Sequence, residues 1–181
     1  MIYNEKTVST EEIFNGRIIR LRVDQVEMLG GNLASREIVE HPGGVGIVAI
    51  TDNDEIIMVK QFRKPLEKAI YEVPAGKLDK GEDHRLCGIR ELSEETGYTA
   101  ESFEYLGYMY PSPGFADELT HLYLATGLTP GEAHLDPDEY LDIEYIKTSK
   151  VVDMIMNNEI NDAKTIFGVF KALEYLRRRE S

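Results

Sequence analysis

Three glutamates crowd one predicted helix, in a stretch where like charges should repel. Glu94 lies three residues and Glu95 four residues after Glu91, so the three side chains share one region of the helix surface. Like charges at this spacing cost about 0.2–0.5 kcal/mol per pair on an exposed helix. Arg90 can pair forward with Glu94 and, if the preceding loop folds back, with Glu82. Such pairing would fix the carboxylates in place and suggests a site that uses them.

A hard divalent cation is one partner that suits this cluster. Mg²⁺ takes oxygen ligands and is usually held by one or two carboxylates together with substrate phosphates. Gly76 and Gly81 mark tight backbone before the helix, where a carbonyl can also turn inward. Leu86, Ile89 and Leu92 are expected to form the buried stripe on the opposite face. The competing interpretation is an ordinary solvated acidic helix face.

Composition excludes several classes of function. The 181-residue chain carries 33 acidic and 20 basic residues, a net charge of -13, which argues against nucleic-acid binding. An anionic substrate would therefore need a metal or a few well-placed arginines. The single cysteine, Cys87, excludes an internal disulfide and fits a reducing cytoplasm. The chain shows neither a signal-peptide pattern nor an apolar run of membrane-spanning length, so no membrane partner is expected.

The apolar pattern predicts an α+β protein with two parts. Residues 1–42 are expected to form a small N-terminal antiparallel β flap, and residues 43–181 a mixed β-sheet sandwiched between helices. The C-terminal helices are expected to turn Phe167 and Phe170 to the core. The predicted strands are 16–29, 33–41, 45–50, 55–62, 70–73, 103–110, 119–126 and 141–146. The predicted helices are 83–97, with a start at 81–82 as the alternative for this helix, 148–157 and 162–179.

The acidic helix carries a longer pattern at fixed spacing. It resembles the Nudix box, G-x5-E-x7-R-E-U-x-E-E-x-G-U, in which U is a bulky aliphatic residue. The only departure is an aromatic residue at the last position. The matching positions are Gly76, Glu82, Arg90, Glu91, Leu92, Glu94, Glu95, Gly97 and Tyr98.

The resemblance implies the Nudix fold and a loop–helix–loop metal site. In that site Glu91, Glu94, Glu95 and the backbone carbonyl of Ala75 would hold Mg²⁺, or Mn²⁺ in its place. Glu82 and Arg90 would join the catalytic set by orienting the helix carboxylates. Glu94 would belong to both sets.

Flanking segments are similar to the ADP-ribose pyrophosphatase branch of that family. The similar stretches are 59–82 and 110–118, and the second contains Pro113 about sixteen residues beyond the glycine that ends the box. This implies Mg²⁺-dependent cleavage of ADP-ribose to AMP and ribose 5-phosphate. Arg36 and Arg63 would contact the substrate by guanidinium forks, and Glu118 would accept bonds from ribose hydroxyls. Another nucleoside diphosphate sugar or a dinucleotide is the alternative substrate, and a non-catalytic ADP-ribose sensor is a further one.

The family pattern also implies a general base and a dimer. Glu139, in the acidic loop 127–140, aligns best with a catalytic glutamate, although Asp136 and Asp138 are chemically equivalent candidates. The residue that stacks on adenine stays open between Arg17 and Phe14. The chain is expected to form a homodimer with exchanged N-terminal flaps, so that Arg36 serves the partner's site.

Overall fold

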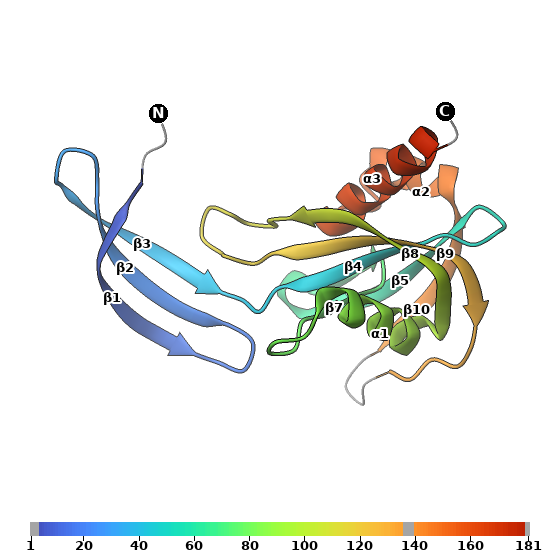
Figure 1. The fold of residues 1–181 in the computed structure, drawn as a ribbon, viewed down its shortest axis with the longest axis horizontal. Coiled ribbons are helices and arrows are strands. Elements are labelled where there is room, and N and C mark those ends of the chain that lie inside the picture. The colour runs from blue at the N-terminus through green and yellow to red at the C-terminus, as the bar shows by residue number, and fades with distance from the viewer. Residues whose placement is uncertain (1–3, 136–139, 180–181) are drawn as a thin grey trace. The chain divides into compact units, whose positions relative to one another are not determined.

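The fold comes from a computed structural model that describes residues 4–135 and 140–179 (Figure 1). Its elements, in chain order, are β1 (Lys6–Asn15), β2 (Arg20–Glu27), β3 (Leu33–Glu40), β4 (Gly44–Ala49), β5 (Glu55–Arg63), the short 3₁₀ helix η1 (Lys64–Leu66), β6 (Lys68–Glu72), β7 (Ala75–Lys77), α1 (His84–Thr96), β8 (Tyr98–Met109), β9 (Thr120–Pro130), β10 (Leu141–Lys147), α2 (Thr148–Met156) and α3 (Ala163–Arg179). In the described part of the chain, no helix is both long and apolar enough to cross a membrane.

The first compact unit is an antiparallel sheet with strand order β1-β2-β3, as an N-terminal flap predicts. This unit consists of Met1–Gly43 together with Tyr110–Leu119, a segment from much later in the chain. The Val39 N–H donates to the Phe115 carbonyl at 2.8 Å, and the Asp117 N–H donates to the Val39 carbonyl at 3.1 Å. The segment that contains Pro113 is therefore attached to β3, which the sequence did not indicate.

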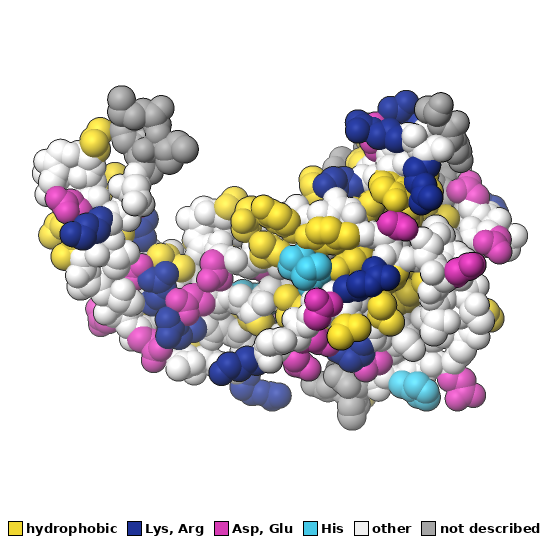
Figure 2. Space-filling model, viewed as in Figure 1, with side chains coloured by type: hydrophobic (Ala, Val, Ile, Leu, Met, Phe, Trp, Pro, Cys, Tyr) yellow, Lys and Arg dark blue, Asp and Glu magenta, His cyan; other side chains and the backbone are white. Residues whose placement is uncertain are grey.

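Charged side chains of both signs are interspersed along this N-terminal sheet (Figure 2). Glu40 on β3 pairs with both Arg20 and Arg22 on β2, at 2.5 and 2.7 Å. Arg22 also pairs with Asp24, whose other carboxylate oxygen accepts from the Thr10 hydroxyl at 2.8 Å. The charges of Arg20, Arg22 and Glu40 are thus paired across strands, which fits a structural role for these residues.

The second unit contains a four-stranded sheet, β7-β4-β9-β8, and a three-stranded sheet, β10-β5-β6. The four-stranded sheet is mixed, because β4 pairs parallel with β9 and antiparallel with β7. Every residue of β4 is buried, since both faces of that strand are covered. This confirms the predicted mixed sheet.

Helices cover both faces of the second unit, again as predicted (Figure 1). On one face α2 and α3 pack their buried residues against Val48, Met58 and Leu122. On the other face α1 packs Cys87 and Leu92 against an aromatic-rich cluster of the sheet. Successive residues of each central strand enter different clusters, which is the period-2 alternation of a sheet buried on both sides.

The expected buried face of α1 was wrong. Leu86 and Ile89 are 62% and 40% exposed, and only Leu92 of the predicted stripe is buried. The helix instead turns Cys87 and Gly88 to the sheet. A Cβ at Gly88 would lie 3.0 Å from the Phe103 ring, so the helix approaches the sheet too closely for a larger residue there.

The expectation that Phe167 and Phe170 face the core was also wrong, because they are 39% and 41% exposed. The small residues of α3 lie against the sheet, among them Gly168, whose Cβ would approach Val48 at 3.2 Å.

Two strands of the structure, β1 and β7, were not predicted from the sequence. β1 is exposed throughout and shows no apolar alternation, and β7 has only three residues.

Candidate active site

Helix α1 begins and ends at the residues that the sequence indicated. The Asp83 carboxylate caps it by accepting from the N–H groups of Arg85 and Leu86, at 2.9 and 3.1 Å. At the other end Gly97 has φ +76° and donates to the Ser93 carbonyl. A left-handed backbone at this position favours glycine. These caps fix the register of every carboxylate that the helix carries.

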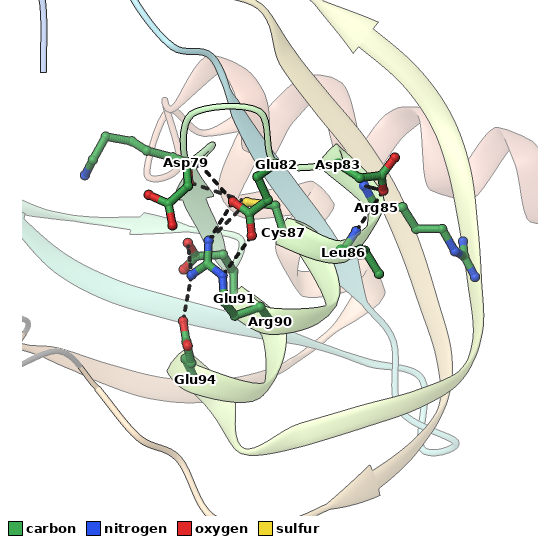
Figure 3. A network of polar contacts seen from close by, with 10 residues as sticks. Asp79, Glu82, Asp83, Arg85, Leu86, Cys87, Arg90, Glu91 and Glu94 are labelled. Carbon is green, nitrogen blue, oxygen red and sulfur yellow. Dashed lines mark hydrogen bonds and ion pairs between the residues drawn. The ribbon is translucent and has the colours of Figure 1, made fainter.

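Arg90 lies at the centre of the glutamate cluster (Figure 3). Its Nε and Nη2 donate to the two carboxylate oxygens of Glu82, at 3.0 and 3.1 Å. Its Nη1 donates to Glu94 at 2.8 Å and to Glu91 at 2.9 Å. The predicted pairing of Arg90 with Glu82 and Glu94 is therefore confirmed, and the link to Glu91 is an addition.

The cluster keeps the Glu82 carboxylate ionised. Hydrogen bonds from Arg90, joined by the backbone N–H of Asp79, lower the pKa of Glu82 to about 2. Cys87, which is fully buried and contacts Arg90 through its sulfur, behaves differently. Burial, together with the nearby Glu82 charge, raises the pKa of the Cys87 thiol to about 12. The thiol stays protonated at neutral pH and does not serve as a nucleophile.

The loop before α1 is built around two of the helix carboxylates. A Cβ at Gly76 would lie 1.9 Å from the Glu91 carboxyl carbon, so Glu91 fills the space that only a glycine leaves open. The Ala75 N–H donates to Glu95 at 2.9 Å. Glu91 and Glu95 are 9% and 2% exposed. The structure therefore brings Ala75, Glu91 and Glu95 together at one place on the second unit.

The donor set fits a hard divalent cation in its chemistry. The cluster offers carboxylate oxygens beside backbone that approaches closely, the ligand type that Mg²⁺ prefers. Arg90 Nη1 lies between Glu91 and Glu94, so this point stabilises positive charge. Within residues 4–135 and 140–179, no three acidic, histidine or cysteine side chains are grouped as a ready metal site. Binding an ion here would thus require the carboxylates to share their contacts with Arg90.

Arg63, predicted to contact the substrate, ends β5 and pairs with Glu72 at the end of β6. Its Nε and Nη2 donate to the two oxygens of Glu72, at 2.5 and 2.8 Å. Glu72 is 1% exposed and also pairs with Lys164 of α3. Burial alone would raise the pKa of Glu72, but the hydrogen bonds and charges of Arg63 and Lys164 lower it. Glu72 and Lys164 were not predicted as site residues, although a glutamate within the apolar stretch "AIYEVPAG" is a usable signal.

The other predicted substrate residues lie in the first unit. Arg36 on β3 forms a two-point ion pair with Glu5, at 2.6 and 2.8 Å. Glu118 lies 3.8 Å from the His41 ring. Pro113 is exposed, and it lies in a tight turn where the Ser112 carbonyl accepts from the Phe115 and Ala116 N–H groups.

The segment after β9 is joined to the end of α1. A Cβ at Gly131 would lie 2.8 Å from the Gly97 carbonyl oxygen, and the His134 N–H donates to the Glu94 carbonyl at 2.8 Å. β9 itself runs to Pro130, into the stretch predicted as loop. The proposed base Glu139 and its alternatives Asp136 and Asp138 lie outside the described residues.

Comparison with known proteins decides the family. The profile of the NUDIX domain matches residues 40–167. The chain belongs to the Nudix family. The profile of the nucleoside diphosphate sugar hydrolase N-terminal domain matches residues 5–42 of this Nudix protein, in front of the catalytic domain. The Nudix box that the sequence suggested is therefore confirmed.

Several Nudix relatives resemble the chain over nearly its whole length. It is 46% identical to an ADP-ribose pyrophosphatase of Bacillus subtilis, over 98% of this chain and 95% of the relative. It is 48% identical to the methanol dehydrogenase activator of Bacillus methanolicus, over 99% and 96%. An ADP-ribose pyrophosphatase of Mycobacterium tuberculosis is 39% identical, over 91% and 81%.

A solved structure confirms the Nudix fold. The crystal structure of an ADP compounds hydrolase covers 97% of this chain and 95% of its own, with a TM-score of 0.86 and 22% sequence identity. Nudix hydrolases generally need a divalent metal, which agrees with the oxygen-rich loop and helix described above.

Proposed function

We propose that the protein hydrolyses the diphosphate of ADP-ribose to AMP and ribose 5-phosphate with Mg²⁺. The observation that carries this is the complete box geometry, with Arg90 holding Glu82, Glu91 and Glu94 at one end of the loop before α1. The names of two relatives support the choice of substrate, since both are ADP-ribose pyrophosphatases aligned over more than nine-tenths of this chain.

The chain's own residues take distinct roles in this proposal. Glu91, Glu94, Glu95 and the Ala75 carbonyl would hold Mg²⁺ or Mn²⁺, which supplies charge neutralisation for the diphosphate and a more acidic bound water. Glu82 fixes Arg90 by two hydrogen bonds, and Arg90 in turn orients Glu91 and Glu94.

The substrate residues complete the proposed site. The forks of Arg63 and Arg36 bind phosphate oxygens. Glu118 accepts bonds from ribose hydroxyls, and Pro113 stiffens the turn beside it. Glu139 accepts the proton of the attacking water.

A substrate panel tests the proposal. We expect ADP-ribose to be hydrolysed with a kcat/KM at least about tenfold above ADP-glucose, GDP-mannose and NADH. The measurement is product release by chromatography at fixed Mg²⁺, with a parallel series lacking the ion. Preference for another compound would move the proposal to that substrate. Binding of ADP-ribose without any release of AMP would replace hydrolysis with sensing.

A second candidate function is activation of a methanol dehydrogenase. It is favoured by the 48% identity to the Bacillus methanolicus activator over 99% of this chain. Adding the protein to a methanol dehydrogenase and following methanol oxidation distinguishes this role from hydrolysis of free ADP-ribose.

We also propose a homodimer with exchanged N-terminal flaps, in which Arg36 serves the partner's site. Apolar side chains exposed on β1 support it, because Val8, Ile13 and Phe14 are 56%, 51% and 54% exposed. Sedimentation should give a particle of twice the chain mass, and activity per chain should fall on dilution. A monomer that stays fully active at high dilution would remove the shared site.

A further inference from the structure

One buried carboxylate beside the proposed site is matched by two cations. Glu72 is 1% exposed and pairs with Arg63 from β5 and with Lys164 from the first turn of α3. Either cation alone would balance its charge. A buried carboxylate left with no cation is strongly destabilising, whereas one that keeps a partner is not. The second cation therefore has a function besides neutralising the charge of Glu72 in the folded chain.

The two cations differ in how firmly they are held. The Arg63 side chain is 41% exposed and projects from the end of its strand. The Lys164 side chain is 17% exposed, and its ammonium also pairs with Asp162 at 3.0 Å. Its stem lies over β4, where a Cβ at Gly46 would be 3.8 Å from the lysine Cδ. Arg63 has room to change partner, and Lys164 has little.

The same network ties α3 to the strand that leads into the proposed metal loop. Asp162 accepts from the Thr165 N–H and hydroxyl, at 3.0 and 2.7 Å. The Thr165 hydroxyl, itself fully buried, accepts from the Val73 N–H at 2.9 Å. These contacts fix Lys164 in position against Glu72, and Glu72 itself lies only a few residues before Ala75 in the chain.

We propose that Lys164 is a positioning residue, which keeps Glu72 paired while the Arg63 guanidinium turns from Glu72 to the substrate diphosphate. The inference rests on the proposed function, because it takes Arg63 as a diphosphate contact. Without Lys164, Glu72 would depend on Arg63 alone, and the guanidinium would be available for substrate in a smaller fraction of molecules. The apparent affinity falls in proportion to that fraction.

Lys164→Met tests the proposal by steady-state kinetics. We expect KM for ADP-ribose to rise by about tenfold, within the range of 5–150-fold that such couplings span. kcat should change much less, because saturating substrate holds Arg63 in its bound position. Lys171→Met is the matched control. Lys171 lies on the same helix, and its ammonium donates to the Leu106 carbonyl at 2.6 Å and not to Glu72. Lys171→Met therefore removes an equal charge at a place away from Glu72 and should leave KM unchanged.

Two further variants separate positioning from general stability. Lys164→Arg keeps a cation beside Glu72 and should restore most of the wild-type KM. In Lys164→Met/Glu72→Gln the neutral amide needs no cation, so KM should return towards the wild-type value. A merely structural lysine would instead lower the midpoint of thermal unfolding in Lys164→Met while KM stayed constant.

The outcomes separate this inference from the proposed function. A wild-type protein that releases no AMP from ADP-ribose overturns the proposed function, and the inference with it. An active wild type with an unchanged KM in folded Lys164→Met overturns the inference alone. So does a raised KM that persists in the double variant, because the effect then does not pass through Glu72.

Discussion

Replacing Glu95 by Gln will lower kcat for ADP-ribose by about 10³-fold, because it removes one charge from the proposed ion site. The amide has nearly the shape of the carboxylate, and its oxygen can still accept from the Ala75 N–H, now at 2.9 Å from Glu95. Glu95 is 2% exposed, and the glutamine fills the same buried space in the variant as the glutamate does in the wild type. The rate of AMP release and the midpoint of thermal unfolding are measured for both proteins, to check that the variant loses activity while it keeps its fold.

The matched control for that variant is Glu159→Gln, which neutralises an exposed glutamate in the turn after α2. It changes the net charge of the chain equally and should keep wild-type kinetics. If both variants turned over ADP-ribose at the same rate, Glu95 would have no part in the reaction and the carboxylate cluster would be structural.

Gly76→Ala should be the second most damaging change, with a loss of about 10²-fold in kcat. The new methyl group would lie 1.9 Å from the Glu91 carboxyl carbon, so the carboxylate must leave its position. Misplacing a catalytic group by about 1 Å can cost about 10²-fold in rate. Because the displaced atoms are the end of a flexible side chain, we expect the thermal midpoint to change far less than the rate.

A double variant shows whether Gly76 acts through Glu91. If it does, Gly76→Ala adds almost nothing to the loss already caused by Glu91→Gln, since the displaced group no longer carries a charge. Independent, multiplying losses in Gly76→Ala/Glu91→Gln would mean instead that the methyl group disturbs the loop backbone itself.

The local features of the site could be predicted because their causes are local. The limits of α1 follow from a capping carboxylate and a left-handed glycine, at Asp83 and Gly97. The pairing of Arg90 with Glu94 follows from their four-residue spacing, and the pairing with Glu82 needed only one tight loop. Each of these contacts is made within about a dozen residues of sequence.

Features that depend on distant segments were missed or wrong. Hydrophobic spacing on α1 pointed to Leu86 and Ile89, but the close approach of the helix to Phe103 selected Gly88 for the buried face. The attachment of 110–119 to β3 rests on backbone hydrogen bonds that carry no side-chain signal. The pairing of Glu72 with Lys164 joins residues 92 positions apart.

The union of Gly131 and His134 with the end of α1 has a consequence for protein engineering. Because Gly131 and His134 are held against the end of the glutamate helix, changes at these two positions are expected to disturb the carboxylates, and an exchange of the following residues should leave 131–134 intact. A graft from another pyrophosphohydrolase should therefore begin after residue 134 and keep a carboxylate at position 139, because the proposed function uses Glu139 as the base.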